Sequence, residues 1–282
     1  MIPLVAVIAA GAMGAAVGKR LTDNGVRVLT SLEGRSESTA ARARAAGMAA
    51  ASDGEIAAAD FILSIVPPGD ALALARRFAP VLAASNAKPI FVDCNAVSPA
   101  TVERVAAAIA PTGCLFVDAG IIGAPPKSGD AGPRFYASGD AASRFATLRD
   151  YGLDIRVLRG PTGAASALKM SYAGITKGTQ AIGAAMILAA TRSGSAEALF
   201  QELAFSQKDV LAWLKQQLAI MPPKAYRWVA EMQEIANFAD ADPATQELYQ
   251  GAAHFYERIA DDFSVAGEDV SALAAFFRKV TD

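Results

Sequence analysis

The sequence is poor in the residues that build metal sites and disulfide frameworks. Of its 282 residues, only His254 is a histidine, and only Cys94 and Cys114 are cysteines. A single histidine argues against a histidine-based metal site and against a Ser-His-Asp triad. Both cysteines lie in apolar segments, which predicts buried, reduced thiols of a cytoplasmic protein. We therefore expect no bound metal and a cytoplasmic location.

An excess of charge of either sign is also missing. Lysine and arginine together number 26 and aspartate and glutamate 28, which gives a net charge of −2. A nucleic-acid partner would need a basic surface, so none is expected. Long hydrophobic runs are scarce too, since the apolar stretch 181–190 is shorter than the ~20 residues that span a bilayer. We expect no membrane partner, and residues 1–17 lack the basic start of a signal peptide.

Hydrophobic residues are abundant, at 53% of the chain, and form short apolar runs separated by helical stretches. The runs predict strands at 4–9, 26–30, 61–66, 89–95, 115–121, 134–139 and 154–159. Strands and helices that alternate at this spacing are typical of an α/β fold with a doubly wound parallel sheet. After Gly160 the pattern is helical to the end of the chain. We therefore predict an α/β domain over residues 1–162 and an all-helical domain over residues 163–282.

A glycine turn joins the first strand to the first helix. Its residues Gly11, Ala12, Met13 and Gly14 follow Ala9, which stands where a dinucleotide-binding fingerprint has its first glycine. Gly11 would let the backbone approach a pyrophosphate, and Gly14 would permit close packing of helix and strand. In this strand–turn–helix context, the turn predicts a Rossmann-type dinucleotide site.

The end of the second strand indicates which dinucleotide binds. Thr30 and Ser31 stand where NAD-binding proteins place an acidic residue for the ribose 2′-hydroxyl, and Arg35 and Ser36 offer groups to a 2′-phosphate. These residues favour NADP as the cofactor. NAD is the less favoured alternative. It would require a different loop path, on which Glu33 would bind the ribose. A solvated polar turn is the remaining interpretation.

Five segments in the same order resemble the 3-hydroxyacid dehydrogenase and 6-phosphogluconate dehydrogenase superfamily. They are GAMG (11–14), SIVPP (64–68), VDCNAVSP (92–99), FVDAGIIGAPP (116–126) and GPTGAASALKMSYAG (160–174). The resemblance implies an NAD(P)-dependent dehydrogenase or reductase. Segment 223–240 is similar to a poorly characterised branch of 6-phosphogluconate-dehydrogenase-like proteins, whose C-terminal domain is distinct.

The resemblance also implies roles for individual residues. It assigns the catalytic lysine to Lys169, which would act as a general acid or base. It also implies that the cofactor is contacted by Val66, Pro67, Pro68 and Asn95. The substrate would be contacted by Ile122 and Gly123. Ile122 and Ala173 replace a serine and an asparagine of the family, so the pocket is less polar than the family pattern.

Three further residues have two interpretations each. Tyr172 is either a second proton donor or an aromatic side chain that packs on the sheet. Lys177 is either an anion anchor for the substrate or part of a salt bridge. Arg227 either binds a substrate carboxylate or pairs with Glu231 one helical turn away.

These observations favour an NADP-dependent oxidoreductase that acts on a small hydroxy acid or sugar acid. Decarboxylation of a 3-keto product is compatible with this chemistry. Reduction of a C=N bond and NADP sensing without turnover are the alternatives. The stretch 164–193 is dense in small residues and segment 198–218 is amphipathic, so we expect the helical domain to form a homodimer.

Overall fold

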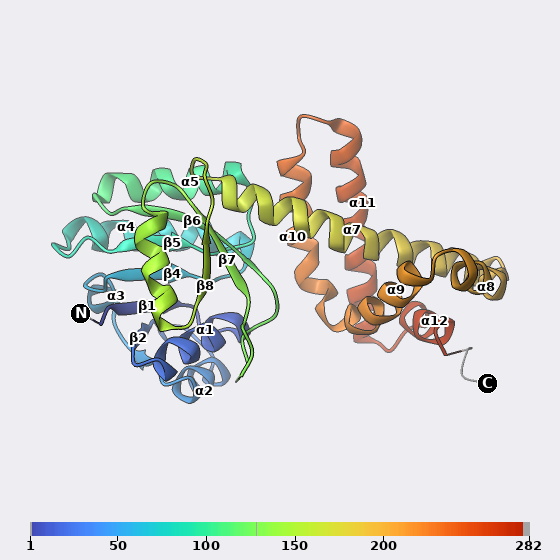
Figure 1. Ribbon diagram of the computed structural model, residues 1–282, viewed down its shortest axis with the longest axis horizontal. Coiled ribbons are helices and arrows are strands. Elements are labelled where there is room, and N and C mark those ends of the chain that lie inside the picture. Colours follow the sequence, from blue (N-terminus) through green and yellow to red (C-terminus); the bar gives the residue numbers. More distant parts are fainter. Residues whose placement is uncertain (1, 128, 279–282) are drawn as a thin grey trace. The chain divides into compact units, whose positions relative to one another are not determined.

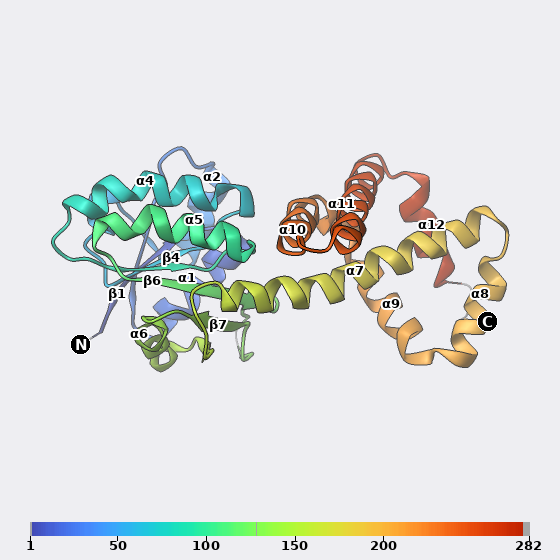
Figure 2. The ribbon, with the colours of Figure 1, turned by 90° about the horizontal axis from the view of Figure 1, so that it is seen from above.

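The structure, a computed structural model, describes residues 2–127 and 129–278. It forms two compact units, Met1–Met170 and Ser171–Asp282. The division falls inside one continuous helix, α7 (Ala164–Arg192), which Figure 2 shows without a break. The predicted boundary was the start of this helix. The observed division lies later because the first turns of α7 hydrogen-bond to the sheet of the first unit.

The first unit contains one eight-stranded sheet in the order β3-β2-β1-β4-β5-β6-β7-β8. Its strands are β1 (Leu4–Ile8), β2 (Arg27–Thr30), β3 (Ala49–Ala50), β4 (Phe61–Ser64), β5 (Ile90–Asp93), β6 (Phe116–Ile122), β7 (Arg134–Ser138) and β8 (Asp154–Val157). The predicted α/β class is confirmed, with one difference. β7 runs antiparallel to β6, and β8 follows β7, so the sheet is mostly rather than wholly parallel. The connection 123–133 is too short for the crossover that a parallel pair needs.

Helices cover both faces of the sheet. They are α1 (Ala12–Asp23), α2 (Glu37–Ala45), α3 (Asp53–Ile56), α4 (Ala71–Ala84), α5 (Pro99–Ile109) and α6 (Ala142–Phe145), with short 3-10 helices η1 (Pro68–Asp70), η2 (Ala110–Thr112) and η3 (Ala146–Tyr151). Successive strand residues enter different cores, as period-two side chains must. Val5 and Val7 pack with α1 and α2, whereas Ala6 and Ile8 pack with α4 and α5. In Figure 1, α4 and α5 lie toward the β5–β6 part of the sheet, and α1 and α2 toward the β1–β2 part.

The second unit is entirely helical over its described residues. Besides the rest of α7 it contains α8 (Ala196–Ser206), α9 (Lys208–Ile220), η4 (Pro222–Lys224), α10 (Ala225–Phe238), α11 (Pro243–Ser264) and α12 (Glu268–Phe276). α10 and α11 lie side by side in both views (Figures 1 and 2). Gly174 of α7 admits the ring of Tyr249 from α11, whose Oη would lie 2.8 Å from an added Cβ. Throughout residues 2–127 and 129–278, no helix combines the length and hydropathy needed to cross a membrane.

Candidate active site

The glycine turn lies where β1 ends, at the sheet edge shared by the carboxyl ends of the parallel strands. α1 begins immediately after Gly11, so its first backbone N–H groups are free of helical partners and favour an anion. A Cβ added to Gly11 would meet nothing within 4 Å, which leaves the turn open to a ligand. A Cβ at Gly14 would lie 1.9 Å from the Ala9 carbonyl oxygen, so only glycine allows α1 this close to β1. Ala12 and Met13 form the first turn of α1, and these features fit a pyrophosphate.

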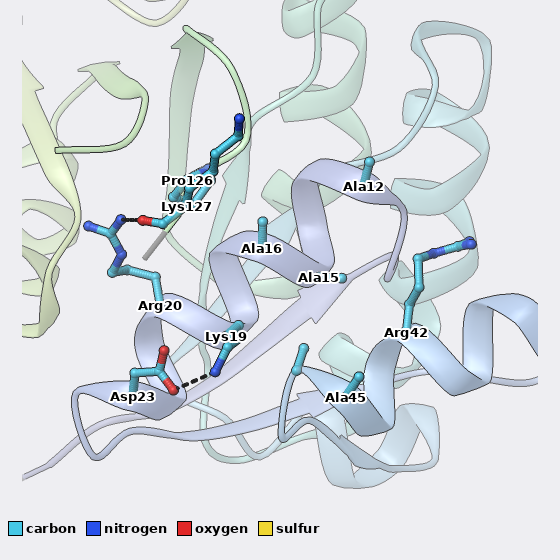
Figure 3. Close-up of a pocket in the computed structure, with 11 residues that line it drawn as sticks. Ala12, Ala15, Ala16, Lys19, Arg20, Asp23, Arg42, Ala45, Pro126 and Lys127 are labelled. Carbon is cyan, nitrogen blue, oxygen red and sulfur yellow. Dashed lines mark hydrogen bonds and ion pairs between the residues drawn. The ribbon is translucent and has the colours of Figure 1, made fainter. Parts of the chain in front are cut away.

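Two arginines brace the turn and its helix. Arg42 of α2 donates from Nε to the Ala10 carbonyl oxygen at 3.2 Å. Arg20 of α1 donates to the backbone oxygens of Lys127 and Asp130, each at 3.0 Å. Figure 3 shows Arg20 reaching the loop after β6, beside a hollow of about 300 Å³ between α1, α2 and this loop. The loop that follows Ile122 and Gly123 is thereby tied to the helix of the glycine turn.

The two residues at the end of β2 that the sequence placed beside the ribose both have hydrogen-bond partners within the protein. The Thr30 hydroxyl is buried and donates to the Val7 carbonyl oxygen at 2.8 Å, so it belongs to the sheet. Ser31 is 4% exposed, and its hydroxyl accepts a hydrogen bond from Arg77 Nη2 at 2.9 Å. Arg77 comes from α4 and also binds Asp53 at the start of α3 through two hydrogen bonds. Sequence reasoning did not identify either residue of this pair.

The turn after β2 is exposed. Glu33 and Arg35 are both exposed, and the Arg35 backbone N–H donates to the Leu32 carbonyl oxygen at 3.1 Å. Ser36 is the N-cap of α2 and accepts from the Thr39 backbone N–H. The Ser36 hydroxyl is therefore already used to start a helix.

The loop after β4 is held by Asn95. The Asn95 side-chain oxygen accepts from the Val66 backbone N–H at 2.7 Å, and its side-chain nitrogen donates to the Ser64 hydroxyl at 2.8 Å. Asn95 is 3% exposed, so its amide fixes the Val66–Pro67–Pro68 loop from beneath. Pro68 then starts η1, and Pro67 is exposed at the same sheet edge as the glycine turn.

Lys169 lies on the first part of α7, against β6. Its Nζ donates to the Ile121 carbonyl oxygen at 2.6 Å, and its side chain is half-buried. Helix and strand approach closely because Gly120 has no side chain: an added Cβ would lie 2.9 Å from the Ala165 carbonyl oxygen and 3.0 Å from Lys169 Cβ. Ile122 follows at the end of β6 and is half-buried, and Gly123 begins the exposed loop beyond it. The lysine ammonium therefore lies where β6 ends, next to the predicted substrate segment.

The start of α7 is anchored by a buried carboxylate. Asp118 Oδ2 accepts from the backbone N–H groups of Gly163, Ala165 and Ser166 at 2.9, 3.0 and 3.0 Å. It also accepts from the Ser138 hydroxyl at 3.0 Å. A carboxylate at this position satisfies orphan helix donors and complements the helix dipole.

The remaining candidates belong to the second unit. Tyr172 is 50% exposed. Lys177 pairs with Glu231 and lies over the Trp228 ring at 5.1 Å, so its charge is already matched within the unit, as the salt-bridge interpretation held. Arg227 lies over the neighbouring Tyr226 ring at 5.6 Å, while its expected partner Glu231 binds Lys177.

Within residues 2–127 and 129–278, no group of three or more His, Cys, Asp or Glu side chains is placed so that it could hold a metal ion. Cys94 and Cys114 are both buried free thiols. Burial raises the pKa of the Cys94 thiol well above its ordinary value, and the nearby Asp93 adds to this.

Comparison with known proteins identifies the family of the chain. Residues 4–150, more than half of the chain, match the NAD binding domain of 6-phosphogluconate dehydrogenase. Residues 190–259 match a domain of unknown function, DUF1932. The chain therefore belongs to the family with the NAD binding domain of 6-phosphogluconate dehydrogenase, within the 3-hydroxyacid dehydrogenase superfamily. Its C-terminal domain contains the DUF1932 domain, as the distinct C-terminal domain of the predicted branch implied. The resemblance found in the motifs is confirmed.

Individual relatives agree with this membership. The solved structure of the conserved protein MTH1747, described as of unknown function and structurally similar to 3-hydroxyacid dehydrogenases, has 32% identity, covers 91% of this chain and 96% of its own, and has a TM-score of 0.71. An uncharacterised 28.5 kDa protein of Methanothermus fervidus is 31% identical over 63% of this chain and 67% of its own. The Mycobacterium tuberculosis 3-hydroxyisobutyrate dehydrogenase structure with L-serine shares the fold, with 24% identity, 99% and 100% coverage and a TM-score of 0.73.

Proposed function

We propose that the protein is an NADP-dependent oxidoreductase that transfers hydride to or from a small hydroxy acid or sugar acid. Lys169 acts as the general acid or base. The observation that carries the proposal is the Lys169 ammonium, 2.6 Å from the Ile121 carbonyl oxygen where β6 ends. The glycine turn lies at the same edge of the same sheet, so one compact unit supplies both a proton-transfer group and a pyrophosphate cradle. The chemistry is compatible with decarboxylation of a 3-keto product.

The residues divide the work of the reaction. NADP supplies or accepts the hydride when it is bound. The N–H groups at the start of α1 would hold the pyrophosphate, and Asn95 keeps the Val66–Pro68 loop in place at the same sheet edge. Lys169 gives a proton to the carbonyl oxygen during reduction, or takes one from the hydroxyl during oxidation.

Replacement of Lys169 tests the proposal. NADPH oxidation is followed with a panel of keto acids, and NADP reduction with a panel of hydroxy acids and sugar acids. On the best substrate, Lys169→Ala lowers turnover by ~10²–10⁴, the usual size of a lost general acid or base. NADPH binding stays nearly intact, because the phosphates are held at the glycine turn. Lys169→Arg does not restore turnover, since a guanidinium keeps its proton.

One control variant and two contrary outcomes make the result decisive. Lys19→Ala removes an exposed lysine that pairs with Asp23 on α1, and it leaves turnover unchanged. Near-normal turnover of Lys169→Ala would contradict the assignment, and Tyr172→Phe would then test the second proton donor. NADPH binding without turnover on any panel would identify a sensor instead of an enzyme.

A second candidate function is reduction of a C=N bond. The observation that favours it is the apolar character of Ile122, which is half-buried at the end of β6 beside Ile121, the acceptor of the Lys169 ammonium. Ile122 replaces a polar residue of the family pattern, and a less polar lining suits an imine better than a hydroxy acid. Cyclic imines in the same NADPH assay separate the two functions.

A further inference from the structure

A fixed cation lies at the end of β2. Arg77 and Ser31 are 46 residues apart in the chain, yet Arg77 Nη2 donates to Ser31 Oγ at 2.9 Å. Ser31 comes directly after β2, and β2 runs parallel to β1, so it shares the sheet edge of the glycine turn. In dinucleotide-binding sheets the adenosine ribose lies beside the residue that follows β2. The guanidinium of Arg77 is therefore at the ribose end of the cradle.

The Arg77 guanidinium is held in a fixed orientation, and in the part of the chain that the structure describes one of its nitrogens keeps donors without an acceptor. Arg77 Nε and Nη2 donate to the two oxygens of Asp53 at 2.8 and 2.6 Å, which fixes the plane of the group. Across the described residues, the hydrogens of the third nitrogen, Nη1, meet no acceptor. The Arg77 side chain is 35% exposed, so these two donors can be reached by a ligand.

We propose that Arg77 binds the 2′-phosphate of NADP and sets the preference for NADP over NAD, with Asp53 as its positioning residue. This inference rests on the proposed function and names the residue that selects its cofactor. A phosphate accepts hydrogen bonds only, which suits the two N–H donors of Nη1. Ser31, which stands where NAD-binding proteins place an acidic residue, is the anchor that holds Arg77 in place.

Arg35 is the competing cation, and the geometry is against it. Arg35 lies on the exposed turn after β2, and none of the contacts found for it in residues 2–127 and 129–278 fixes its side chain. Ordering a free arginine on binding costs conformational entropy, whereas Arg77 is already ordered by two partners. Glu33, on the same exposed turn, is the group that would favour a ribose hydroxyl and hence NAD.

The experiment measures nucleotide binding by calorimetry on the full chain. The probes are adenosine 2′,5′-bisphosphate, which carries the 2′-phosphate, and adenosine 5′-monophosphate, which lacks it. The wild type binds the bisphosphate more tightly. Arg77→Ala weakens binding of the bisphosphate about 10- to 100-fold, the usual effect of a lost charged hydrogen bond. Binding of the monophosphate changes less than about twofold, which also shows that the variant is folded.

Neighbouring variants provide matched controls. Arg76→Ala removes the same charge from an exposed position of the same helix and changes neither affinity. Arg77→Lys keeps the charge but loses the forked geometry, so it recovers only part of the preference. Asp53→Asn leaves monophosphate binding unchanged and reduces the preference for the bisphosphate, which a purely structural role would not do.

Three results would overturn the inference. Equal losses for both nucleotides in Arg77→Ala would mean that Arg77 does not contact the 2′-phosphate. A selective loss in Arg35→Ala, with Arg77→Ala unchanged, would assign the phosphate to the exposed arginine. Equal wild-type affinities would indicate NAD and point to Glu33, with dinucleotide binding retained. If the wild type bound neither nucleotide, the proposed function itself would fail.

Discussion

The Asp118 carboxylate and the Ser166 hydroxyl join β6 to the first turn of α7, with 2.6 Å between Asp118 Oδ1 and Ser166 Oγ. Asp118 is fully buried, and its other oxygen accepts from the Ser166 backbone N–H at 3.0 Å. The strand that carries Ile121 and the helix that carries Lys169 are therefore fixed to each other by one side chain. The proposed proton-transfer group depends on this connection for its position.

Replacement of this carboxylate tests the connection. Asp118→Asn replaces one acceptor by an amide donor that faces the helix N–H groups, so the free energy of unfolding falls by about 1–3 kcal/mol. Denaturant unfolding measures the loss. Asp150→Asn, at an exposed position of the same unit, is the control and leaves stability unchanged. Equal stabilities of the two variants would show that the buried hydrogen bonds contribute nothing net.

A second prediction concerns the loop after β6. Arg20 Nη2 donates to the Asp130 carboxylate and to the Lys127 carbonyl oxygen, each at 3.0 Å, and its side chain is only 18% exposed. Arg20→Ala removes these bonds, so the loop opens more often and trypsin cleaves after Lys127 faster. Limited proteolysis followed by mass spectrometry measures the rate at that bond.

The neighbouring lysine supplies the control for this loop. Lys19 lies on the same helix, pairs with Asp23 at 2.9 Å and is 56% exposed (Figure 3). Lys19→Ala leaves the cleavage rate after Lys127 unchanged. The same rate in Arg20→Ala and wild type would mean that other contacts hold the loop.

The parts of the site that could be predicted are those written in contiguous sequence. The glycine turn and the segment of Lys169 are local motifs in a regular strand–helix alternation, and the structure places both at one sheet edge. The prediction of a parallel sheet missed the reversal of β7, although the connection 123–133 is too short for a crossover helix.

Pairings between distant residues could not be predicted. Arg77 and Asp53 come from different helices, and α3, which carries Asp53, has only four residues, too few for a periodic signal. Lys177 and Glu231 are 54 residues apart, so their ion pair depends on the packing of α7 and α10. Local patterns fix where a charged side chain starts, and the tertiary fold decides which partner it meets.

Thiol reactivity gives a third prediction. The thiolate is the reactive form, and burial raises the pKa of Cys94, so the fraction of thiolate at pH 8 is lower than for an exposed cysteine. Cys114 is 8% exposed and shielded by packing. In the native protein, neither Cys94 nor Cys114 therefore reacts with a thiol-specific chromogenic disulfide. Both thiols react after the protein is unfolded. Rapid stoichiometric reaction of the native protein would contradict the buried placement.

The second unit carries an apolar surface that we propose is covered by a second copy of the chain. Ile175, Ile182 and Met186 lie along one face of α7 and are 70%, 52% and 57% exposed. The face continues into a groove of about 330 Å³ between α7 and α11, which includes Leu248, 50% exposed. A single self-complementary patch of this kind suits a two-fold dimer, and monomers seldom leave so much apolar surface in water.

Disruption of this surface is the last prediction. Light scattering at micromolar concentration gives the wild type twice the mass of one chain. Ile182→Glu places a charge at the centre of the patch, where burial against a second copy would strip it of water, so this variant is monomeric. Ile2→Glu alters an exposed isoleucine of the first unit and leaves the dimer intact. A monomeric wild type would exclude the second copy as the partner that covers α7.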